Sequence, residues 1–222
     1  MQGDSPNVLY GPGQKDYRRL YYSDEDNVLQ VPITLSPGFG VLKAGTALAI
    51  NTSALTTGNK SKYMPYNPTA MTGAEDAPVR SYLMQNSTNS VNVHVGIEDS
   101  YKFKVGDDIV IGNSTLSGEN LGAITAIDRT TYNYKAVISA TVAVSGTTYT
   151  TATFAYVAPE GCDACVGILG KSVDTGKGVN SVGANAPILL SSYILYTSGL
   201  INVDAAAIVD LSLKTIGQFT YN

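Results

Sequence analysis

The chain has 222 residues and a formal net charge of −4; hydrophobic residues make up 44% of it and charged residues only 14%. This length allows one large or two small domains with a sizeable core, and two cysteines are too few for a disulfide framework. Because the chain has no basic cluster and no apolar run near the roughly 20 residues of a membrane helix, we expect neither a nucleic-acid partner nor a membrane span.

The beginning of the chain predicts an N-terminal arm rather than core. Residues 1–30 combine glycine, proline, charged residues and four tyrosines with no helical or strand period, a composition typical of a segment that a partner orders. The alternative is an extended segment laid on the protein's own surface. The start of the chain has no basic residues followed by an apolar stretch, so we expect no secretory signal.

From residue 31 onward the pattern is that of a mostly β protein. Short runs of β-branched and aromatic residues alternate with polar ones and are separated by Gly, Pro, Asn and Asp. Expected strands lie at 31–35, 40–50, 62–68, 90–98, 120–144 with a turn near Asp128–Thr131, 165–169 and 186–199. We also expect residues 101–111 to form two strands paired about a Gly-Asp turn.

One helix is expected, over residues 204–217. Asp204 is a good N-cap, three alanines follow it, and Gly217 stands where a helix commonly ends. Apolar side chains recur in this segment at intervals of three and four residues. They would form a stripe that faces the core.

A C-x-x-C pair, Cys162 and Cys165, suggests redox or metal chemistry. A redox pair lowers its thiol pKa at a helix N-terminus, but a β-branched apolar run follows here. A structural zinc site needs four ligands, whereas this chain has two cysteines and one histidine, His94, which stands in an alternating strand. We therefore expect two strand cysteines without redox or metal function.

Two further motifs follow the cysteines. Gly170-Lys171-Ser172 matches the end of a phosphate-binding loop, but Cys165 stands where the first glycine belongs and the residues that follow favour turns over a helix. Asp174-Thr175-Gly176 matches an aspartic protease motif but is also an ordinary turn. The acidic pairs Glu98-Asp99 and Asp107-Asp108 are most simply turn residues. We therefore expect a non-enzymatic protein that has no metal or cofactor and works by binding or by assembly.

Three segments, read in order, resemble the lambda-type bacteriophage head decoration (capsid-stabilising, or cement) protein family. They are GVLKAGTALAI at 40–50 with KYMPYNP at 62–68, then DACVGILGKSVD at 163–174 with APILLSSYILYTSGLI at 186–201, and finally DAAAIVDLSLKTIGQF at 204–219. The resemblance implies a decoration-protein-like β-tulip or small-barrel core with one C-terminal helix. It also implies that the segment holding the three motifs is a scaffold strand and its exit turn.

The resemblance leaves a long segment without a counterpart. Residues 72–159 show a strand, a Gly-Asp turn and further strands, which predicts a small β-barrel or sandwich inserted in a loop. The expected organisation is an arm at 1–30, a discontinuous decoration-type β core at 31–71 and 160–222, and an inserted β domain at 72–159.

The resemblance further implies a structural virion protein, made in the host cytoplasm, that binds the capsid exterior. It would act as a homotrimer, contact the major capsid protein and stabilise the expanded head.

We expect the arm to bind the capsid, because tyrosines offer large amphipathic contacts and arginines offer forked donors to carboxylates. The arm residues predicted to bind are Tyr10, Tyr17, Arg18, Arg19, Tyr21, Tyr22, Val28 and Leu29. Residues 27–35 can add an extended strand to an exposed sheet edge. The alternative is another β-rich phage surface module, such as a tail, fibre or adhesin component.

Overall fold

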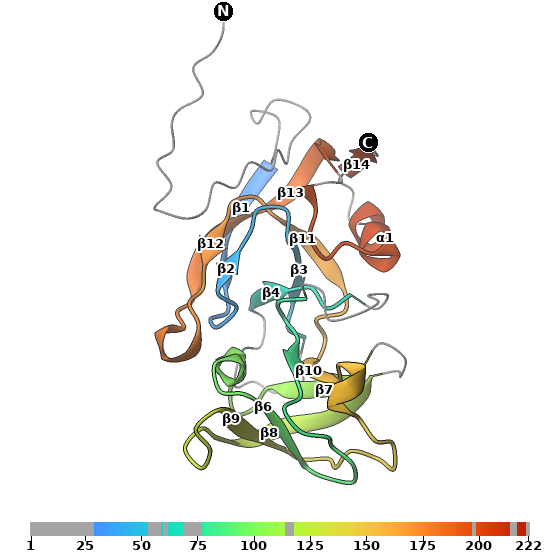
Figure 1. Cartoon of the computed structure of the whole chain (residues 1–222). Coiled ribbons are helices and arrows are strands. Elements are labelled where there is room, and N and C mark those ends of the chain that lie inside the picture. The colour runs from blue at the N-terminus through green and yellow to red at the C-terminus, as the bar shows by residue number, and fades with distance from the viewer. Residues whose placement is uncertain are drawn as a thin grey trace, which may run out of the picture.

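The computed structural model describes residues 29–52, 59, 62–68, 77–113, 118–196, 199–213 and 217–220. Within these residues the protein is mostly β, with one α-helix and two six-stranded sheets that lie one above the other in Figure 1. The β-rich class predicted from the sequence is therefore confirmed. No helix in this part of the chain is long and apolar enough to cross a bilayer.

The first sheet combines strands from both sides of the predicted insertion. In order across the sheet they are β1 (Leu29–Leu35), β4 (Tyr63–Pro65), β3 (Ala47–Ile50), β11 (Cys165–Leu169), β13 (Ala184–Tyr196) and β14 (Gly217–Thr220). Because β1 also pairs with β13, the first five of these strands close into a barrel. A small two-stranded sheet joins β2 (Val41–Leu42) to β12 (Val173–Asp174).

The second sheet contains only residues of the middle of the chain. In order across the sheet its strands are β5 (Ser81–Tyr82), β10 (Tyr156–Pro159), β7 (Asp108–Gly112), β8 (Glu119–Asp128), β9 (Lys135–Ala140) and β6 (Asn92–Gly96). A β-bridge between Leu83, just after β5, and Val95 of β6 connects the two outer strands. This sheet therefore also closes on itself, which leaves few unpaired backbone edges.

Each sheet encloses its own cluster of buried apolar side chains. Strand alternation supplies them; in β1, for example, Ile33 and Leu35 are buried while Pro32 and Thr34 are exposed. Small side chains at the two connections between the sheets pack in the first cluster; they are Ala77, Val79 and Ala158. The second sheet runs from Ser81 to Pro159, inside the predicted insertion at 72–159. That this segment is a separable domain stays a prediction.

The predicted C-terminal helix is α1, Ala205–Leu213, and its predicted N-cap is confirmed. The Asp204 carboxylate accepts a hydrogen bond from the Ala207 N–H at 2.8 Å, which satisfies one of the backbone donors that a helix start leaves free. Asp210, on the helix, accepts a hydrogen bond from the Cys165 N–H at 2.8 Å. This bond fixes α1 against β11, beside which it lies in Figure 1.

The turn predicted near Asp128 is confirmed. Strand β8 ends at this residue, and its carboxylate accepts hydrogen bonds from the backbone N–H groups of Thr130 and Thr131 before β9 begins. An aspartate that binds the backbone two or three residues ahead is a common turn device. Short 3₁₀ turns also occur, as η2 (Asp99–Lys102), η3 (Thr151–Thr153) and η4 (Gly178–Asn180).

The strand pair predicted over residues 101–111 is wrong. Only β7 forms there; the residues before it end the 3₁₀ turn η2 at Lys102 and then make a turn. Gly106 adopts a left-handed φ of 94°, and the Asp107 carboxylate accepts a hydrogen bond from the Lys104 N–H at 2.8 Å. This local hydrogen bond makes a tight turn that enters β7 from a 3₁₀ helix rather than from a strand.

Candidate functional site

The two cysteines of the C-x-x-C pair have structural positions. Cys162 and Cys165 are buried free thiols at the start of β11. Burial raises the pKa of the Cys162 thiol, and the negative charge of Asp163 adds to this effect. A raised thiol pKa suppresses the thiolate that redox and metal chemistry require.

The phosphate-loop and protease motifs hold two turns together. The Thr175 hydroxyl accepts a hydrogen bond from the Phe39 N–H at 3.0 Å and donates one to the Gly40 carbonyl at 2.9 Å, all within the buried part of the protein. The Gly176 N–H donates to the Asp174 carboxylate, as the turn prediction expected. Ser172 accepts a hydrogen bond from the Ala44 N–H and is followed by β12 rather than by a helix.

The single histidine and the acidic pairs form no metal centre within the described ranges. His94 points away from the second core and meets the ring of Tyr132 edge-on, with 6.1 Å between ring centroids. Burial, followed by the charge of Lys135, lowers the pKa of His94. Across the parts of the chain that the structure describes, no three His, Cys, Asp or Glu side chains are grouped to hold a metal ion.

Most of the predicted capsid-binding residues lie outside the described residues. They are Tyr10, Tyr17, Arg18, Arg19, Tyr21, Tyr22 and Val28. Leu29 is the first residue of β1, which pairs antiparallel with β13 from Leu29 to Leu35. The strand is thus part of this chain's own barrel, which corrects the prediction that residues 27–35 as a whole join a partner's sheet. On its other side β1 pairs only at Leu35, so within the described residues the edge from Leu29 to Thr34 has no strand partner.

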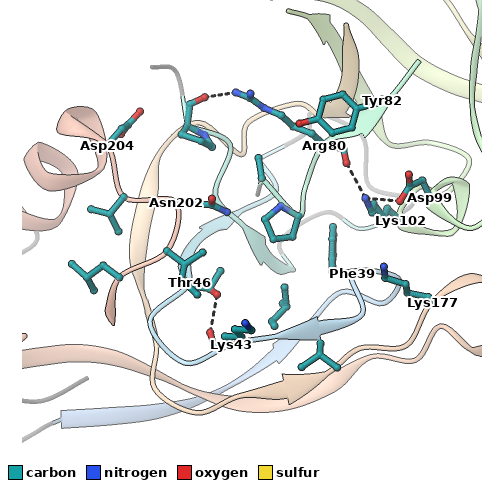
Figure 2. A pocket seen from close by; sticks show the side chains of 18 residues that line it. Phe39, Lys43, Thr46, Arg80, Tyr82, Asp99, Lys102, Lys177, Asn202 and Asp204 are labelled. Atoms are coloured by element: carbon teal, nitrogen blue, oxygen red, sulfur yellow. Dashed lines mark hydrogen bonds and ion pairs between the residues drawn. The ribbon is translucent and has the colours of Figure 1, made fainter. Parts of the chain in front are cut away.

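A cavity of about 720 Å³ lies where the two sheets meet (Figure 2). This volume is within the range of about 300–1,000 Å³ that is usual for ligand sites. Its walls come from both barrels and from the loop before α1. The lining residues are Phe39, Val41, Leu42, Lys43, Thr46, Pro68, Ala77, Pro78, Arg80, Tyr82, Asp99, Lys102, Lys177, Leu200, Ile201, Asn202, Val203 and Asp204.

The charged lining of this cavity is mainly positive. Its cations are Lys43, Arg80, Lys102 and Lys177, and its carboxylates are Asp99 and Asp204, so it carries two more positive than negative charges. Both carboxylates are already engaged. Asp99 pairs with Lys102 at 2.8 Å, and Asp204 caps α1 and accepts a hydrogen bond from the Tyr66 hydroxyl at 3.0 Å.

Arg80 is held in the wall by neutral groups. Only 6% of this residue is exposed, its Nε donates to the Asn67 side-chain oxygen at 2.9 Å, and its guanidinium lies 4.0 Å from the centre of the Tyr156 ring. A second guanidinium nitrogen donates to the Pro68 carbonyl. The backbone carbonyl of Arg80 in turn accepts a hydrogen bond from the Lys102 ammonium at 2.8 Å.

Lys177 is an exposed cation at the edge of the same cavity. Its side chain runs past Gly40, where an added Cβ would lie only 2.7 Å from the Lys177 Cε, so the glycine makes room for it. Lys177 is close enough to lower the pKa of Lys102, although burial of Lys102 has the larger effect. Two positive charges are therefore crowded on this wall.

Backbone and side-chain contacts hold the two barrels in place around the cavity. Gly38 of the first barrel packs directly on the Tyr101 and Lys102 backbone of the second, since a Cβ there would lie 2.9 Å from the Lys102 nitrogen. The Asn59 side chain donates to the Asp107 carboxylate at 3.0 Å and to the Lys102 carbonyl at 3.3 Å. The cavity is consequently bordered by direct contacts between the two barrels.

No protein-family model, curated protein or solved structure matches this chain. Sequence reasoning missed the cavity because its four cations come from separate segments with no shared motif. Lys43 and Lys102 lie in expected strands, and Arg80 and Lys177 are isolated charges in loops. No local pattern could have brought them together.

Proposed function

We propose that the protein is a non-enzymatic virion component that binds the outside of a phage capsid and stabilises the expanded head. One relationship between sequence and fold carries this proposal. The segments that resemble decoration proteins, although separated along the chain, all contribute strands to the first sheet or form α1. The strands from the segment without a counterpart make up the second sheet, between Ser81 and Pro159. A decoration-type β core with an inserted β domain would have this arrangement.

The surroundings of the reactive groups also favour a binding role. The buried thiols lie at the start of β11, Thr175 links two turns, and Ser172 holds the loop before β3. Each of these groups is used by the fold. We therefore place the binding function on the protein's surfaces and on the arm.

Capsid stabilisation of this kind follows from linkage. A protein that binds only the expanded shell stabilises it by RT ln(1 + [L]/Kd) at each site, and the effect adds over the many sites of a head. A homotrimer at a threefold position would contact several major capsid protein subunits at once. Three arms on one trimer also raise the effective concentration of the later contacts after the first arm binds.

Co-sedimentation with capsids tests the proposal. Purified protein is added to expanded heads that lack it and, as a control, to unexpanded shells. We expect saturable, near-stoichiometric binding to expanded heads, together with a higher rupture temperature. Absence of binding to expanded heads would reject the decoration role and favour a tail, fibre or adhesin module.

A further inference from the structure

A row of exposed side chains crosses the outer face of the second barrel. The Leu83 N–H donates to the Ala155 carbonyl at 2.8 Å, and both side chains belong to the buried core of this barrel. The residues next to this pair, Met84 and Phe154, therefore lie beside each other and face outward, where 49% and 54% of their surfaces are exposed. Two large apolar side chains are thus presented together to solvent.

The row continues on the other side of Met84. The Met84 N–H donates to the His94 carbonyl of β6 at 2.8 Å, and His94 lies opposite Val137 of β9. The ring of Tyr132, which is 38% exposed, meets the His94 ring edge-on. Because neighbouring strands lie about 4.8 Å apart, the row spans about 14 Å from β9 to Phe154. This aromatic row consists of Tyr132, His94, Met84 and Phe154.

The backbone at Phe154 has an unusual conformation. Its φ is 51°, in the left-handed region that a bulky side chain rarely adopts. The Phe154 N–H donates to the Thr151 carbonyl at 3.2 Å, at the end of the 3₁₀ turn η3. Phe154 takes no part in either buried core. Strained residues of this kind cluster at ligand sites. The fold therefore holds a strained aromatic ring at the surface without using it for packing.

Amide side chains border the aromatic row. Asn86 and Asn92 are exposed residues, each two positions along the chain from a member of the row. The Asn86 side-chain oxygen accepts a hydrogen bond from the Thr151 N–H at 2.9 Å, and that of Asn92 accepts one from the Ser139 hydroxyl at 2.7 Å. Within the described part of the chain these bonds use the amide oxygens, so the NH₂ groups remain as donors to a ligand.

The aromatic row is uncharged at neutral pH. Burial, followed by the charge of Lys135, lowers the pKa of His94, so its ring is neutral at pH 7. The Lys135 ammonium is itself engaged, because it donates to the Gln85 side-chain oxygen at 2.8 Å and lies 4.3 Å from the centre of the Tyr132 ring. A neutral row of rings with amides beside it complements an uncharged ligand that has apolar faces and hydroxyl edges better than an acidic or basic partner.

We propose that the aromatic row binds a neutral polysaccharide. The face of an aromatic ring carries partial negative charge, which attracts the weakly positive C–H groups on the face of a sugar ring. The Asn86 and Asn92 amides donate to hydroxyl oxygens at the edge of the sugar. The length of the row suits a short stretch of a linear chain. The proposal does not depend on the decoration role, because its test uses the purified protein without capsids.

Affinity electrophoresis tests the proposal. The purified full chain is run in native gels that contain dextran, laminarin, mannan or galactan, which are neutral polysaccharides with different sugars or linkages, and in gels that contain alginate, which is acidic. We expect at least one neutral polysaccharide to retard the protein in proportion to its concentration. Retardation by none of them, or by alginate alone, would overturn the proposal.

Substitutions at Phe154 identify the contact. Phe154→Asn removes the ring but places there a residue that tolerates the left-handed backbone, so the fold should be preserved, which circular dichroism checks. We expect its affinity for the retarding polysaccharide to fall at least about tenfold, as loss of an aromatic anchor commonly causes. Phe154→Tyr keeps the ring and should bind like the original protein. Tyr132→Ala, at the other end of the row, should also weaken binding.

The matched control is Val179→Ala in η4. Val179 is an apolar side chain that is 83% exposed and lies outside the aromatic row, so its truncation should leave the affinity unchanged. Equal affinities of Phe154→Asn and Val179→Ala would contradict the assignment of the site to the aromatic row.

Discussion

The Asp107 carboxylate accepts hydrogen bonds from both the backbone N–H and the side-chain amide of Asn59, at 2.5 Å and 3.0 Å. Asn59 belongs to the loop between β3 and β4 of the first barrel, whereas Asp107 begins the turn into β7 of the second. This contact between residues 48 positions apart crosses the joint that forms the cavity wall. It also makes the joint sensitive to substitution and pH.

Asp107→Asn should destabilise the protein. One carboxylate oxygen of Asp107 accepts hydrogen bonds from the Asn59 amide and from the Lys104 N–H. In asparagine, one of the two oxygens is replaced by an NH₂ group, which can only donate, so donors around this site lose an acceptor. Because Asp107 is buried, the unpaired donors should cost about 2–4 kcal/mol in the free energy of unfolding. Urea denaturation at pH 7 measures this change. The exposed Asp163→Asn serves as control, and a loss as small as that of the control would contradict the role of Asp107.

Glu160→Gln should stabilise the protein at neutral pH. Burial, with the nearby charges of Asp163 and Asp108, raises the pKa of Glu160 above its usual 4.5, and one of its carboxylate oxygens is buried without a partner among the described residues. Because the pKa of Glu160 is higher in the folded than in the unfolded protein, the protonated carboxyl group favours the folded state. This stabilisation is complete at pH values below the pKa of the unfolded chain. It is lost as pH rises through the folded pKa.

The glutamine cannot ionise, so it should avoid this loss. After allowance for solvent screening, we expect Glu160→Gln to raise the free energy of unfolding by about 0.5 kcal/mol at pH 7 and by almost nothing at pH 3. Thermal unfolding at the two pH values measures the difference, with the exposed Glu98→Gln as control. A gain at pH 3 equal to that at pH 7 would mean that charge is not the cause.

Deletion of the second barrel should leave the first barrel folded when the deletion ends at paired residues. Ser81 and Val157 lie opposite each other in an antiparallel pair, so a short glycine-containing turn can connect Arg80 to Ala158. This cut keeps Ala77, Val79 and Ala158 in the first core. We expect a soluble β-rich protein that is less stable by about 2–4 kcal/mol, because the Asn59–Asp107 contact and the packing of Tyr156 on the first core are lost. Circular dichroism and urea denaturation provide the measurement; an unfolded or insoluble product would show that the two barrels depend on each other.

Removal of residues 1–23 should abolish binding to expanded heads while the barrels remain folded. The deletion removes the six tyrosine and arginine residues that we expect to contact the capsid but leaves β1. Tyr21→Ala with Tyr22→Ala in the full chain should weaken binding by at least about tenfold, as loss of two aromatic anchors commonly does. Co-sedimentation with heads measures both effects. Full occupancy by the truncated protein at the same concentration would place the capsid contact on the barrel instead.

Local sequence alone determined several elements of this fold. The Asp204 cap and the alanines after it predict α1 because capping bonds and helix propensity involve only neighbouring residues. An alternating pattern predicts β1 and an apolar β-branched run predicts β11 for the same reason, and Asp128 predicts its turn. The resemblance to decoration proteins also rests on such local segments, and its functional meaning stays a proposal.

Other features were decided only by tertiary structure. The segment 101–107 has a strand-like pattern, but it ends the 3₁₀ turn η2 at Lys102 and then turns into β7, where Asn59, far away in the chain, and Lys104 bind Asp107. Closure of each barrel depends on pairings between strands remote in sequence, such as β1 with β13. The cavity and its excess of positive charge arise where several loops meet. No residue carries a local signal of such a meeting, because proximity in space is set by the packing of both cores.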